Sequence, residues 1–444
     1  MRKVGLYTLG CKVSLYETEA VGEAFERAGF EIAPFDEVCD VYVINTCTVT
    51  AESDAKSRKY IRRAIRKNPD AVVIAIGCYA QRAPDEVMKI EGVSAVIGTE
   101  NKLSAVDIAL KILADRETSG EENNKITPTV SVSELDFATF EPMCIESAPR
   151  TRAYVKIEDG CECKCTYCAI SGARGPVRSK RPEDVIREVE GLYKNGTREI
   201  VLTGIETGSY GADFPEKYDL ADLLCELDAR DSCERVRLGS MAPELLSERF
   251  IGRVAPLKIL TPHFHVSMQS GADSVLHRMK RRYSRKMALD NIKRIKELMP
   301  RVMLTADLMV GFPGESEEDF LDTMRFVSEA GLLDAHVFAY SRRDGTPAAD
   351  YPDQIPEQVK HERSARLISE CARVRDEVLT RVVLRQEPLG VIFESKKGAY
   401  LYGHSDSYIE VCAEGNGKCG ELSLVKPERH DNGVIYGKII ENNN

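Results

Sequence analysis

The chain has 444 residues, of which 43% are hydrophobic and 30% charged, so it is long enough for about two to four domains with sizeable cores. The formal net charge of -10 excludes a protein that binds nucleic acid through overall positive charge, and any RNA contact must use local basic patches. No signal-peptide pattern opens the chain, no apolar run approaches the roughly 18 residues of a membrane span, and the 14 cysteines favour metal or redox chemistry in the cytoplasm.

The first predicted domain covers residues 1–116 and alternates strands with helices. Strand patterns occupy Lys3–Leu9, Asp40–Asn45 and Ala71–Ile76. Apolar residues at helical spacing fill Glu17–Ala28, between the first two strands. Strands that alternate with helices in this way predict a parallel sheet with right-handed crossovers.

Each of these three strands is followed by a cysteine, in the strings LGCK, NTCT and IGCY. Because the carboxyl ends of parallel strands share one edge of a sheet, Cys11, Cys47 and Cys78 are expected to converge there. Buried cysteines are common in protein cores, so one cysteine in such a position would mean little. Three with the same placement indicate a site that offers three thiolates to an iron-sulfur cluster.

A charged helix is predicted for Ser53–Lys67, soon after the second of these cysteines. Its basic residues are Lys56, Arg58, Lys59, Arg62, Arg63, Arg66 and Lys67. A charge run of this kind is more often a solvated face than a binding surface. A role in contacting RNA phosphates stays open beside that interpretation.

The central domain is predicted for residues 149–378, after a linker at residues 117–148 in which the string SGEENNKITP is polar and rich in turn formers. Its strand patterns are Ala153–Ile157, Glu199–Thr203, Val236–Gly239, His263–Met268, Val302–Val310 and Ala335–Tyr340. Helical patterns follow these strands, for example at Glu183–Lys194, Glu317–Glu329 and Glu357–Glu377. Six strand-helix units in series predict a partial barrel with its site at the carboxyl ends of the strands.

The loop after the first of these strands holds four cysteines in the string DGCECKCTYCAISGARG. Cys161, Cys165 and Cys168 stand in the order C-x3-C-x2-C, which lets one loop present three thiolates to a cubic cluster. Clusters that only carry electrons normally take four cysteines, so three ligands leave one iron open to a small molecule. A zinc knuckle would need a second pair of ligands farther along the chain. Cys163 fits neither half of the pattern and stays outside the ligand set.

The third unit is predicted for residues 379–441, where the pattern changes to short alternating runs. These runs are LGVIFES, GAYLYGHS, SYIEVCAE and GVIYGKII, and turn-forming Gly, Asp and Asn residues separate them. A small all-β barrel is the expected result. Its lysines are few against its acidic residues, so charge alone would not indicate RNA binding.

Several of these strings resemble known protein families. The cysteine loop, with Tyr167 before its last cysteine, resembles the signature of the radical S-adenosylmethionine (SAM) superfamily. The strings TLGCKVSLYETE, INTCTVT, IGCYAQ, RMKRRY and YSRRDGTPAA resemble the methylthiotransferases of that superfamily. The string AYLYGHSDSYIEV resembles the RNA-associated TRAM domain, with Ala399 in place of a glycine. The resemblance implies an α/β fold class with a parallel-sheet N-terminal domain, a central partial (βα)6 radical SAM barrel and a C-terminal all-β TRAM barrel.

The same resemblance implies two 4Fe-4S clusters and SAM as cofactors. In the family, the cluster that matches Cys161, Cys165 and Cys168 cleaves SAM to give a 5'-deoxyadenosyl radical. The cluster that matches Cys11, Cys47 and Cys78 handles the sulfur. The positions that match cofactor-binding segments of the family are Tyr167, Gly204, Glu206, Ser240, Gln269 and Asp307.

The resemblance finally predicts the reaction and its partners. TLGCKV followed by SLYETE looks closest to the branch that inserts a methylthio group at carbon 2 of N6-threonylcarbamoyladenosine 37 in tRNA. The expected partners are the tRNA anticodon loop, SAM and an electron donor of flavodoxin or ferredoxin type, with no membrane. Two alternatives remain open. One is a methylthiotransferase acting on isopentenyladenosine tRNA or on a ribosomal-protein aspartate, and the other is a non-catalytic iron-sulfur RNA-binding protein.

Overall fold

The computed structural model of the chain divides into two compact units and describes residues 1–119, 128–135, 138–148 and 151–440. Unit 1 comprises Met1–Ile145, Glu158–Lys180 and Ser341–Ala349. Unit 2 comprises Glu146–Ile157, Arg181–Tyr340 and Asp350–Asn444. Parts of the predicted linker, residues 149–150 at the start of the predicted central domain and residue 441 lie outside the described residues. The four-part division of the chain stays a prediction.

Unit 1 is built on a six-stranded parallel sheet with the strand order β2-β1-β3-β4-β5-β6. The strands are β1 (Lys3–Thr8), β2 (Glu31–Ala33), β3 (Val41–Thr46), β4 (Val72–Gly77), β5 (Ala95–Ile97) and β6 (Thr129–Ser131). The three strands predicted from sequence are β1, β3 and β4, which lie side by side in the sheet. The strands that the sequence did not reveal have three residues each, too few to show a period. One of them, β6, falls within the predicted linker.

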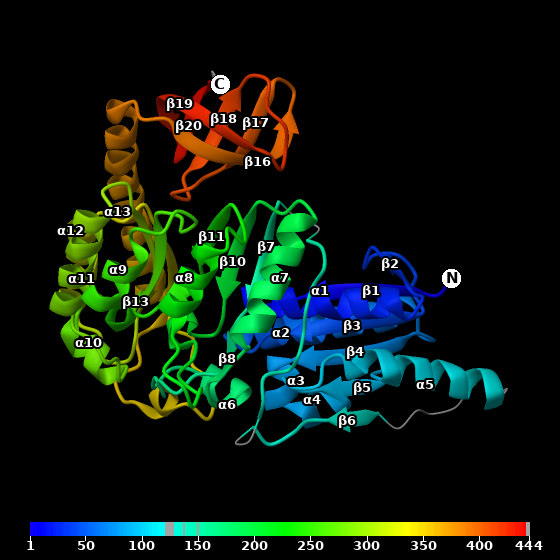
Figure 1. Cartoon of the computed structure of the whole chain (residues 1–444). Helices are drawn as coiled ribbons and strands as arrows, with labels where there is room; N and C mark the ends of the chain where they lie inside the picture. Colours follow the sequence, from blue (N-terminus) through cyan, green and yellow to red (C-terminus); the bar gives the residue numbers. More distant parts are fainter. Residues whose placement is uncertain (120–127, 136–137, 149–150, 441–444) are drawn as a thin grey trace. The chain divides into compact units, whose positions relative to one another are not determined.

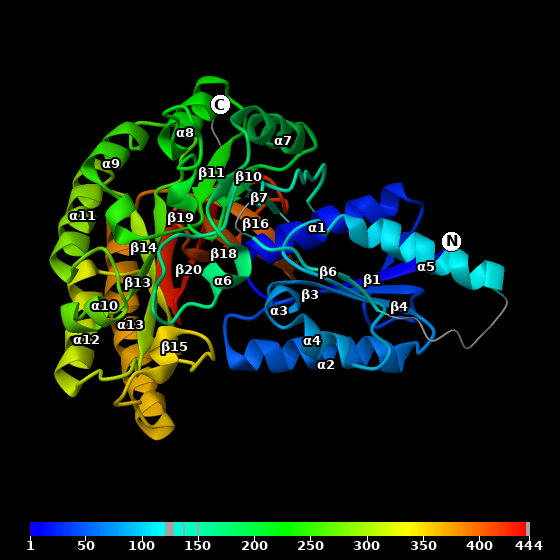
Figure 2. The ribbon, with the colours of Figure 1, turned by 90° about the horizontal axis from the view of Figure 1, so that it is seen from below.

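Helices cover both faces of this sheet, α1 and α5 on one side and α2, α3 and α4 on the other (Figure 2). Their bounds are α1 (Lys12–Arg27), α2 (Ala51–Lys67), α3 (Cys78–Arg82), α4 (Pro84–Met88) and α5 (Ser104–Ser119). Successive side chains of a strand point to opposite faces, so Val43 of β3 packs with Phe25 of α1, and Ile44 packs with Ile61 of α2. Burial on both faces explains why the central strands read as continuous apolar runs.

Unit 2 contains the predicted six-stranded partial barrel, which is confirmed with boundaries shifted by one residue or so (Figure 1). The six predicted strands are β7 (Arg152–Lys156), β10 (Glu199–Thr203), β11 (Arg235–Leu238), β13 (His263–Gln269), β14 (Met303–Val310) and β15 (Asp334–Ala339), and the structure adds the short strand β12 (Ser240–Met241). They form two parallel sheets, β11-β10-β7 and β12-β13-β14-β15, which the bridge between Val236 and Leu260 joins. Among the described pairings, none links β7 to β15, so the barrel stays open.

The helices of unit 2 follow the strands as the sequence predicts. They are α7 (Pro182–Lys194), α8 (Leu220–Ala229), α9 (Glu248–Val254), α10 (Asp273–Arg278), α11 (Arg285–Leu298), α12 (Glu317–Ala330) and α13 (Glu357–Arg385). In α13, buried residues recur every three or four positions from Lys360 to Val382, so the helix continues through the boundary predicted at residue 378. No helix in the described ranges is both long and apolar enough to cross a membrane.

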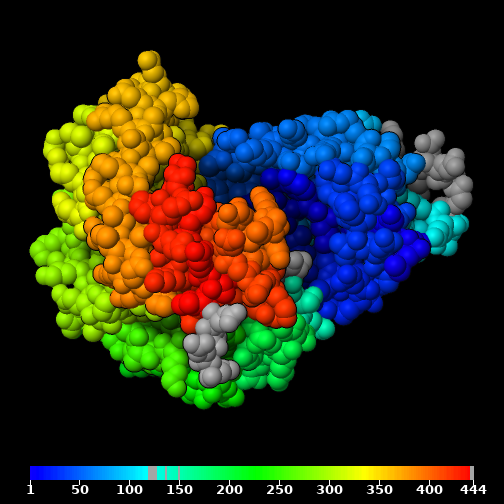
Figure 3. All heavy atoms as spheres, turned by 90° about the horizontal axis from the view of Figure 1, so that it is seen from above, coloured from blue at the N-terminus to red at the C-terminus, as the bar shows by residue number. Residues whose placement is uncertain are grey.

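After α13 the chain forms a closed five-stranded barrel, as predicted, and Figure 3 shows its surface in orange and red. Its strands are β16 (Leu389–Lys397), β17 (Tyr400–Ser405), β18 (Glu410–Glu414), β19 (Leu422–Asp431) and β20 (Val434–Ile440). The sequence did not reveal β19, because its LSLVKPERHD pattern contains Pro427. A proline usually excludes a strand interior, and the pairing register with β20 shifts beside it.

The closed barrel packs against the amino-terminal ends of the unit 2 strands. Arg152, the first residue of β7, forms an ion pair with Glu394 at 2.5 Å. His263, the first residue of β13, stacks on the ring of Tyr408 with centroids 4.7 Å apart. The guanidinium of Arg237, in β11, lies 4.9 Å from the centre of the same ring. The carboxyl ends of these strands, where barrel enzymes place their sites, are therefore at the other end from this contact.

Candidate functional site

Three cysteines follow three neighbouring strands of the unit 1 sheet, and we call them the strand-end cysteines. Cys11 precedes α1 directly, Cys47 follows β3, and Cys78 follows β4 as the first residue of α3. Because β1, β3 and β4 are adjacent and parallel, these cysteines share one edge of the sheet. Cys11 is exposed, whereas Cys47 and Cys78 are buried.

Two glycines allow the backbone segments at this edge to approach each other. Gly10 has a φ of +113°, and a Cβ at this position would lie 3.3 Å from Sγ of Cys47. Gly77 has a φ of +94°, and a Cβ there would lie only 2.3 Å from the Asn45 side-chain oxygen. Both positions have a left-handed backbone, which favours glycine beside two of the strand-end cysteines, and at Gly77 there is also no room for a Cβ.

Burial shapes the acidity of two strand-end cysteines. It raises the pKa of the Cys47 thiol and raises the pKa of the Cys78 thiol to about 11, although the positive charge of Arg174 acts against the second shift. The charge of Cys11 would raise both pKa values further. Without a bound cation, these two side chains are neutral thiols at pH 7, and their thiolate forms need positive charge beside them.

The other cysteines form part of a loop at residues 158–180, which belongs to unit 1 and which we call the cysteine loop. Its base is a short antiparallel pair of strands, β8 (Glu158–Asp159) and β9 (Arg178–Ser179). The Cys161 N–H donates to the carbonyl of Gly175 at 3.0 Å, which ties the start of the loop to the end of helix α6 (Ile170–Arg174). Local hydrogen bonds therefore hold the loop closed.

Backbone amides in the cysteine loop point at the sulfur atoms. The Cys163 N–H donates to Sγ of Cys161 at 3.5 Å, and the Ile170 N–H donates to Sγ of Cys168 at 3.4 Å. Such bonds stabilise negative charge on sulfur and tune iron-sulfur clusters. Cys165 is buried, and Tyr167 is half-buried beside it.

In the part of the chain that the structure describes, no group of three His, Cys, Asp or Glu residues is arranged to hold a metal ion. A cubane binds each thiolate at a different iron, so it needs a wider thiol spacing than the ligands of a single zinc ion. The two cysteine sets therefore fit a cluster by their number and donor type, and they do not form a compact single-ion site.

A segment from near the end of the barrel sequence, Ser341–Ala349, joins both cysteine sets within unit 1. The buried Arg343 donates to Oγ1 of Thr48, the neighbour of a strand-end cysteine, at 2.8 Å. The Ala348 N–H donates to the carbonyl of Thr166, inside the cysteine loop, at 2.9 Å. This segment is the YSRRDGTPAA string of the sequence without its first residue, and these contacts give it a structural role at both sets.

Arg174, the last residue of α6, connects the cysteine loop to a strand-end cysteine. Its side chain is fully buried, and its Nε–H donates to Sγ of Cys78 at 3.1 Å. Its Nη1 group donates to Glu17 of α1 at 2.6 Å and to Asp159 of β8 at 3.0 Å. Burial alone would lower the pKa of Arg174, but the charges of Asp159, Cys78 and Glu17 hold that pKa well above its usual value.

Further buried charges complete this network. Lys102 lies 3.2 Å from Glu17, and Arg178 lies 3.3 Å from Asp159. Sequence reasoning missed the network, because its members are far apart in the chain. One signal was present, since Glu17 occupies the apolar face of a predicted helix, where an ionised side chain needs a partner.

In unit 2, four of the predicted cofactor-binding residues lie at or just beyond strand ends. Gly204 follows β10, and the buried Glu206 accepts a hydrogen bond from the Ala242 N–H at 3.1 Å. Ser240 lies in β12, and Gln269 is the last residue of β13. The strand order places all of them toward the carboxyl edge of the two sheets.

Gln269 has two unusual features. Its φ is +65°, a left-handed conformation that is rare outside glycine. Its side-chain oxygen is buried and has no hydrogen-bond partner among the described residues. Strained backbone and an unsatisfied buried acceptor both concentrate at ligand sites, so Gln269 is suited to accept a hydrogen bond from a bound molecule.

Asp307 lies inside β14 and already has partners on two neighbouring strands. Nε2 of His265 lies 3.1 Å from one carboxylate oxygen, and Nδ1 of His336 lies 3.3 Å from the other. Burial acts to raise the pKa of Asp307, but the hydrogen bonds from the two histidines outweigh it and lower this pKa. His263 and His265 both contact the Thr305 hydroxyl, so they face the same side, as their alternate spacing predicts.

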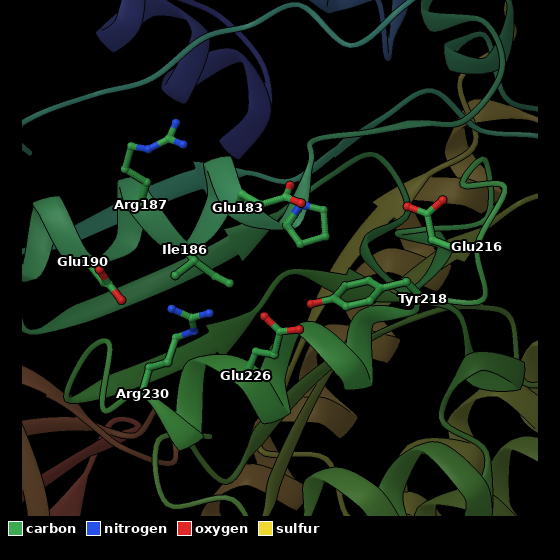
Figure 4. Close-up of a pocket in the computed structure, with 9 residues that line it drawn as sticks. Glu183, Ile186, Arg187, Glu190, Glu216, Tyr218, Glu226 and Arg230 are labelled. Carbon is green, nitrogen blue, oxygen red and sulfur yellow. The ribbon is translucent and has the colours of Figure 1, made fainter.

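A separate cavity lies between helices α7 and α8 (Figure 4). Glu183 and Glu190 line it from α7, Glu226 lines it from α8, and Tyr218 points toward Glu226 from the preceding loop. None of the predicted site residues is among its lining residues. The cavity is thus distinct from both cysteine sets and from the strand ends.

Comparisons with known proteins identify two regions of the chain. Residues 155–327 match the Radical SAM superfamily, and residues 3–98 match the uncharacterized protein family UPF0004. The first region contains the cysteine loop and most of the barrel, and the second contains all three strand-end cysteines.

Curated relatives extend over nearly the whole chain. The threonylcarbamoyladenosine tRNA methylthiotransferase MtaB of Bacillus subtilis is 39% identical over 99% of this chain and 98% of its own length. The protein of the same name from Aquifex aeolicus is 33% identical over 95% of this chain and 99% of its own length. A tRNA-2-methylthio-N(6)-dimethylallyladenosine synthase from Acidothermus cellulolyticus is 36% identical, but it covers 82% of this chain and 72% of its own length.

Among solved structures, the radical SAM methyltransferase TsrM from Kitasatospora setae, with cobalamin and a [4Fe-4S] cluster bound, has a similar fold. Its TM-score is 0.58 at 16% identity, over 78% of this chain and 77% of that one. Two three-cysteine sets, a partial barrel and end-to-end relatives lead to the same conclusion: the chain belongs to the radical SAM methylthiotransferase family, together with the MtaB proteins.

Proposed function

We propose that this protein inserts a methylthio group at carbon 2 of N6-threonylcarbamoyladenosine 37 in tRNA. The observation that carries the proposal is the presence of two three-cysteine sets in one compact unit, in a chain that matches MtaB proteins from end to end. The C2–H bond of an adenine ring is not activated toward ordinary nucleophilic substitution. Radical chemistry, with sulfur held nearby, is a direct way to replace that hydrogen.

The cysteine sets fit one 4Fe-4S cluster each. Cys161, Cys165 and Cys168 would hold the first, in a loop whose amides already donate to two of the sulfur atoms. Cys11, Cys47 and Cys78 would hold the second, with Arg174 aimed at the last of these thiols. When bound, the first cluster and SAM supply the 5'-deoxyadenosyl radical, and the second cluster supplies a binding place for the transferred sulfur.

The strand-end residues of unit 2 are proposed to position SAM. Glu206 offers a carboxylate that suits the ammonium group of SAM, and Gly204 lets the backbone come close to it. Gln269 offers a buried acceptor that lacks a partner in the described chain, and Ser240 offers a hydroxyl. Asp307 fits a supporting role better, because two histidines already bind its carboxylate.

The proposed partners follow from the reaction. The target adenine must leave its loop to reach the protein, which single-stranded RNA in an anticodon loop permits. An external donor of flavodoxin or ferredoxin type would deliver the electron that starts SAM cleavage. The closed barrel of unit 2 is proposed to be a TRAM domain that contacts the RNA, and the protein is proposed to work in the cytoplasm.

Measurement of modified nucleosides tests the proposal. A strain that lacks this gene should lose 2-methylthio-N6-threonylcarbamoyladenosine from its tRNA and keep the unthiolated nucleoside, and the wild-type gene should restore it. If the strain instead lost the methylthio derivative of isopentenyladenosine, the substrate would be isopentenyladenosine in tRNA, as the names of the dimethylallyladenosine synthases suggest. If the deletion strain kept all methylthio nucleosides in its tRNA but lost a methylthio group from a ribosomal protein, the result would contradict any tRNA substrate.

A further inference from the structure

We propose that Arg174 is a positioning residue that binds the Cys78 thiolate and sets the reduction potential of the second cluster. The inference rests on the proposed function, which places a cluster on the strand-end cysteines. The direct observation is the Nε–H hydrogen bond to Sγ of Cys78 at 3.1 Å, made by a fully buried side chain. A guanidinium at this distance would place a hydrogen bond and a positive charge on a sulfur ligand of the second cluster.

The contacts of the two Nη groups of Arg174 hold its Nε–H in position toward Cys78. Both carboxylate oxygens of Glu17 accept from Arg174, at 2.6 and 3.2 Å, and Asp159 accepts at 3.0 Å. Because the guanidinium is planar, these contacts define the position of Nε. Glu17 lies on α1, one turn and a half after Cys11, and Asp159 lies two residues before Cys161. Arg174 is thus held by elements that carry both cysteine sets.

The contact between Arg174 and Cys78 affects the reduction potential of the second cluster. Hydrogen bonds to cluster sulfurs and nearby positive charge stabilise the more negative, reduced state of an iron-sulfur cluster. Arg174 therefore raises the reduction potential of the second cluster relative to the same cluster without it. Within the described residues around Cys78, this guanidinium is the group whose donor is aimed at the sulfur.

The test uses full-length protein in which Cys161, Cys165 and Cys168 are alanine, so that only the second cluster forms. Arg174→Gln and Arg174→Lys are introduced into this background and reconstituted anaerobically with iron and sulfide. Arg237→Gln is the matched control, because Arg237 is also buried and bonds to a carboxylate, that of Glu199, but belongs to unit 2 and bonds to no sulfur. Potentials are read by redox titration with electron paramagnetic resonance detection.

The expected result is a shift of the midpoint potential to more negative values in Arg174→Gln and a smaller shift in Arg174→Lys, which keeps the charge but not the planar fork. Arg237→Gln should keep the parent potential. An unchanged potential in Arg174→Lys and Arg174→Gln at full iron content would overturn the inference, and Arg174→Lys decides alone if the glutamine variant does not fold. Failure of the parent to take up iron would instead remove the proposed second cluster itself.

A second, independent observation concerns α2, where we infer that a basic stripe binds the phosphates of the RNA. The stripe consists of Lys59, Arg62 and Arg66, which recur at i, i+3 and i+7 and are all exposed. On the helical wheel they lie opposite the buried face formed by Ser57, Ile61 and Ala64. They span about 10 Å along the helix axis at 1.5 Å per residue.

Three of the other basic residues of α2, Lys56, Arg58 and Arg63, have acidic partners, and the fourth, Lys67, is exposed at the end of the helix without an ion pair in the described chain. Lys56 pairs with Glu52 and Arg63 with Asp36, whereas the stripe residues have no acidic partner within 4 Å in the described chain. A chain of net charge -10 thus leaves three neighbouring cations without compensation, on the helix that begins four residues after Cys47. The inference rests on the proposed function, in which tRNA is the substrate, and the negative charge of an RNA backbone complements the stripe.

A salt titration of tRNA binding tests the stripe. The variant Lys59→Gln/Arg62→Gln/Arg66→Gln is compared with wild type for binding of full-length tRNA that carries N6-threonylcarbamoyladenosine. The control is Arg325→Gln/Arg366→Gln/Arg373→Gln, since each of these arginines already pairs with a carboxylate. The stripe variant should bind more weakly and lower the salt slope by about 2, at 0.7 to 0.9 for each lost phosphate contact.

If the stripe variant and wild type had the same affinity for tRNA and the same salt slope, the inference about the stripe would be overturned. The same loss in the control variant would also overturn it, because a general charge effect would then explain both results. Wild-type protein that binds no tRNA at all would count against the proposed substrate and not against the stripe alone.

Discussion

Replacement of Cys11, Cys47 and Cys78 by alanine is expected to lower the iron content from about eight to about four atoms per chain, because each cubane holds four. The variant should still cleave SAM to 5'-deoxyadenosine after reduction with dithionite, since the cysteine loop is intact. Methylthio insertion into tRNA should fall to background, because the transferred sulfur has no binding place. Anaerobic iron analysis, chromatography of 5'-deoxyadenosine and mass spectrometry of nucleosides measure the three results in one preparation.

The matched control for this experiment is a variant with Cys144, Cys225 and Cys419 changed to alanine. None of these three side chains is fully buried, so packing should change little. The control should keep about eight irons by the same stoichiometry. Full iron content in the strand-end variant, or equal loss in the control, would show that the second cluster is not bound by the strand-end cysteines.

The second large effect is expected from replacement of Cys161, Cys165 and Cys168 by alanine. Iron should again fall to about four atoms per chain, but SAM cleavage should now disappear together with methylthio insertion. The physical reason is that these three cysteines would hold the cluster that supplies the electron for SAM cleavage. Chromatography of the 5'-deoxyadenosine formed after reduction with dithionite measures the loss of SAM cleavage.

Cys163→Ala provides the internal control within the same loop. The spacing excludes Cys163 from the ligand set, and in the structure its backbone N–H donates to Sγ of Cys161. Alanine keeps that N–H, so iron content and SAM cleavage should stay at the wild-type level. If Cys163→Ala lost as much iron as the triple variant, the ligand set predicted from the C-x3-C-x2-C spacing would be wrong.

The sequence was sufficient to predict the fold class and the placement of the six cysteines along it. Buried strands of five to eight residues show as apolar runs, and β1, β3 and β4 were found in that way. Parallel strands share a carboxyl edge, so residues that follow different strands were expected at one edge, whereas the order of the strands in the sheet was not predicted. Neighbouring strands then bring distant cysteines to one edge without any knowledge of side-chain contacts.

The contacts that support the site could not be predicted in the same way. Arg174 meets Glu17 across 157 positions of sequence, and Arg343 meets Thr48 across 295. No local period encodes such pairs, because each residue alone reads as an ordinary charged side chain. The assignment of the cysteine loop to unit 1 was also missed, since the loop continues directly from β7 of unit 2 in sequence.

The place where the closed barrel attaches limits how RNA can use it. Strands β13 and β14 have seven and eight residues. At about 3.3 Å per residue, roughly 23 to 26 Å separates the two edges of the sheet. An RNA held by the closed barrel would have to run along the flank of the strands before a nucleotide reached their far edge. The closed barrel would then bind the RNA at a distance from the reaction site. Substitutions in the closed barrel should weaken tRNA binding while SAM cleavage continues at its normal rate.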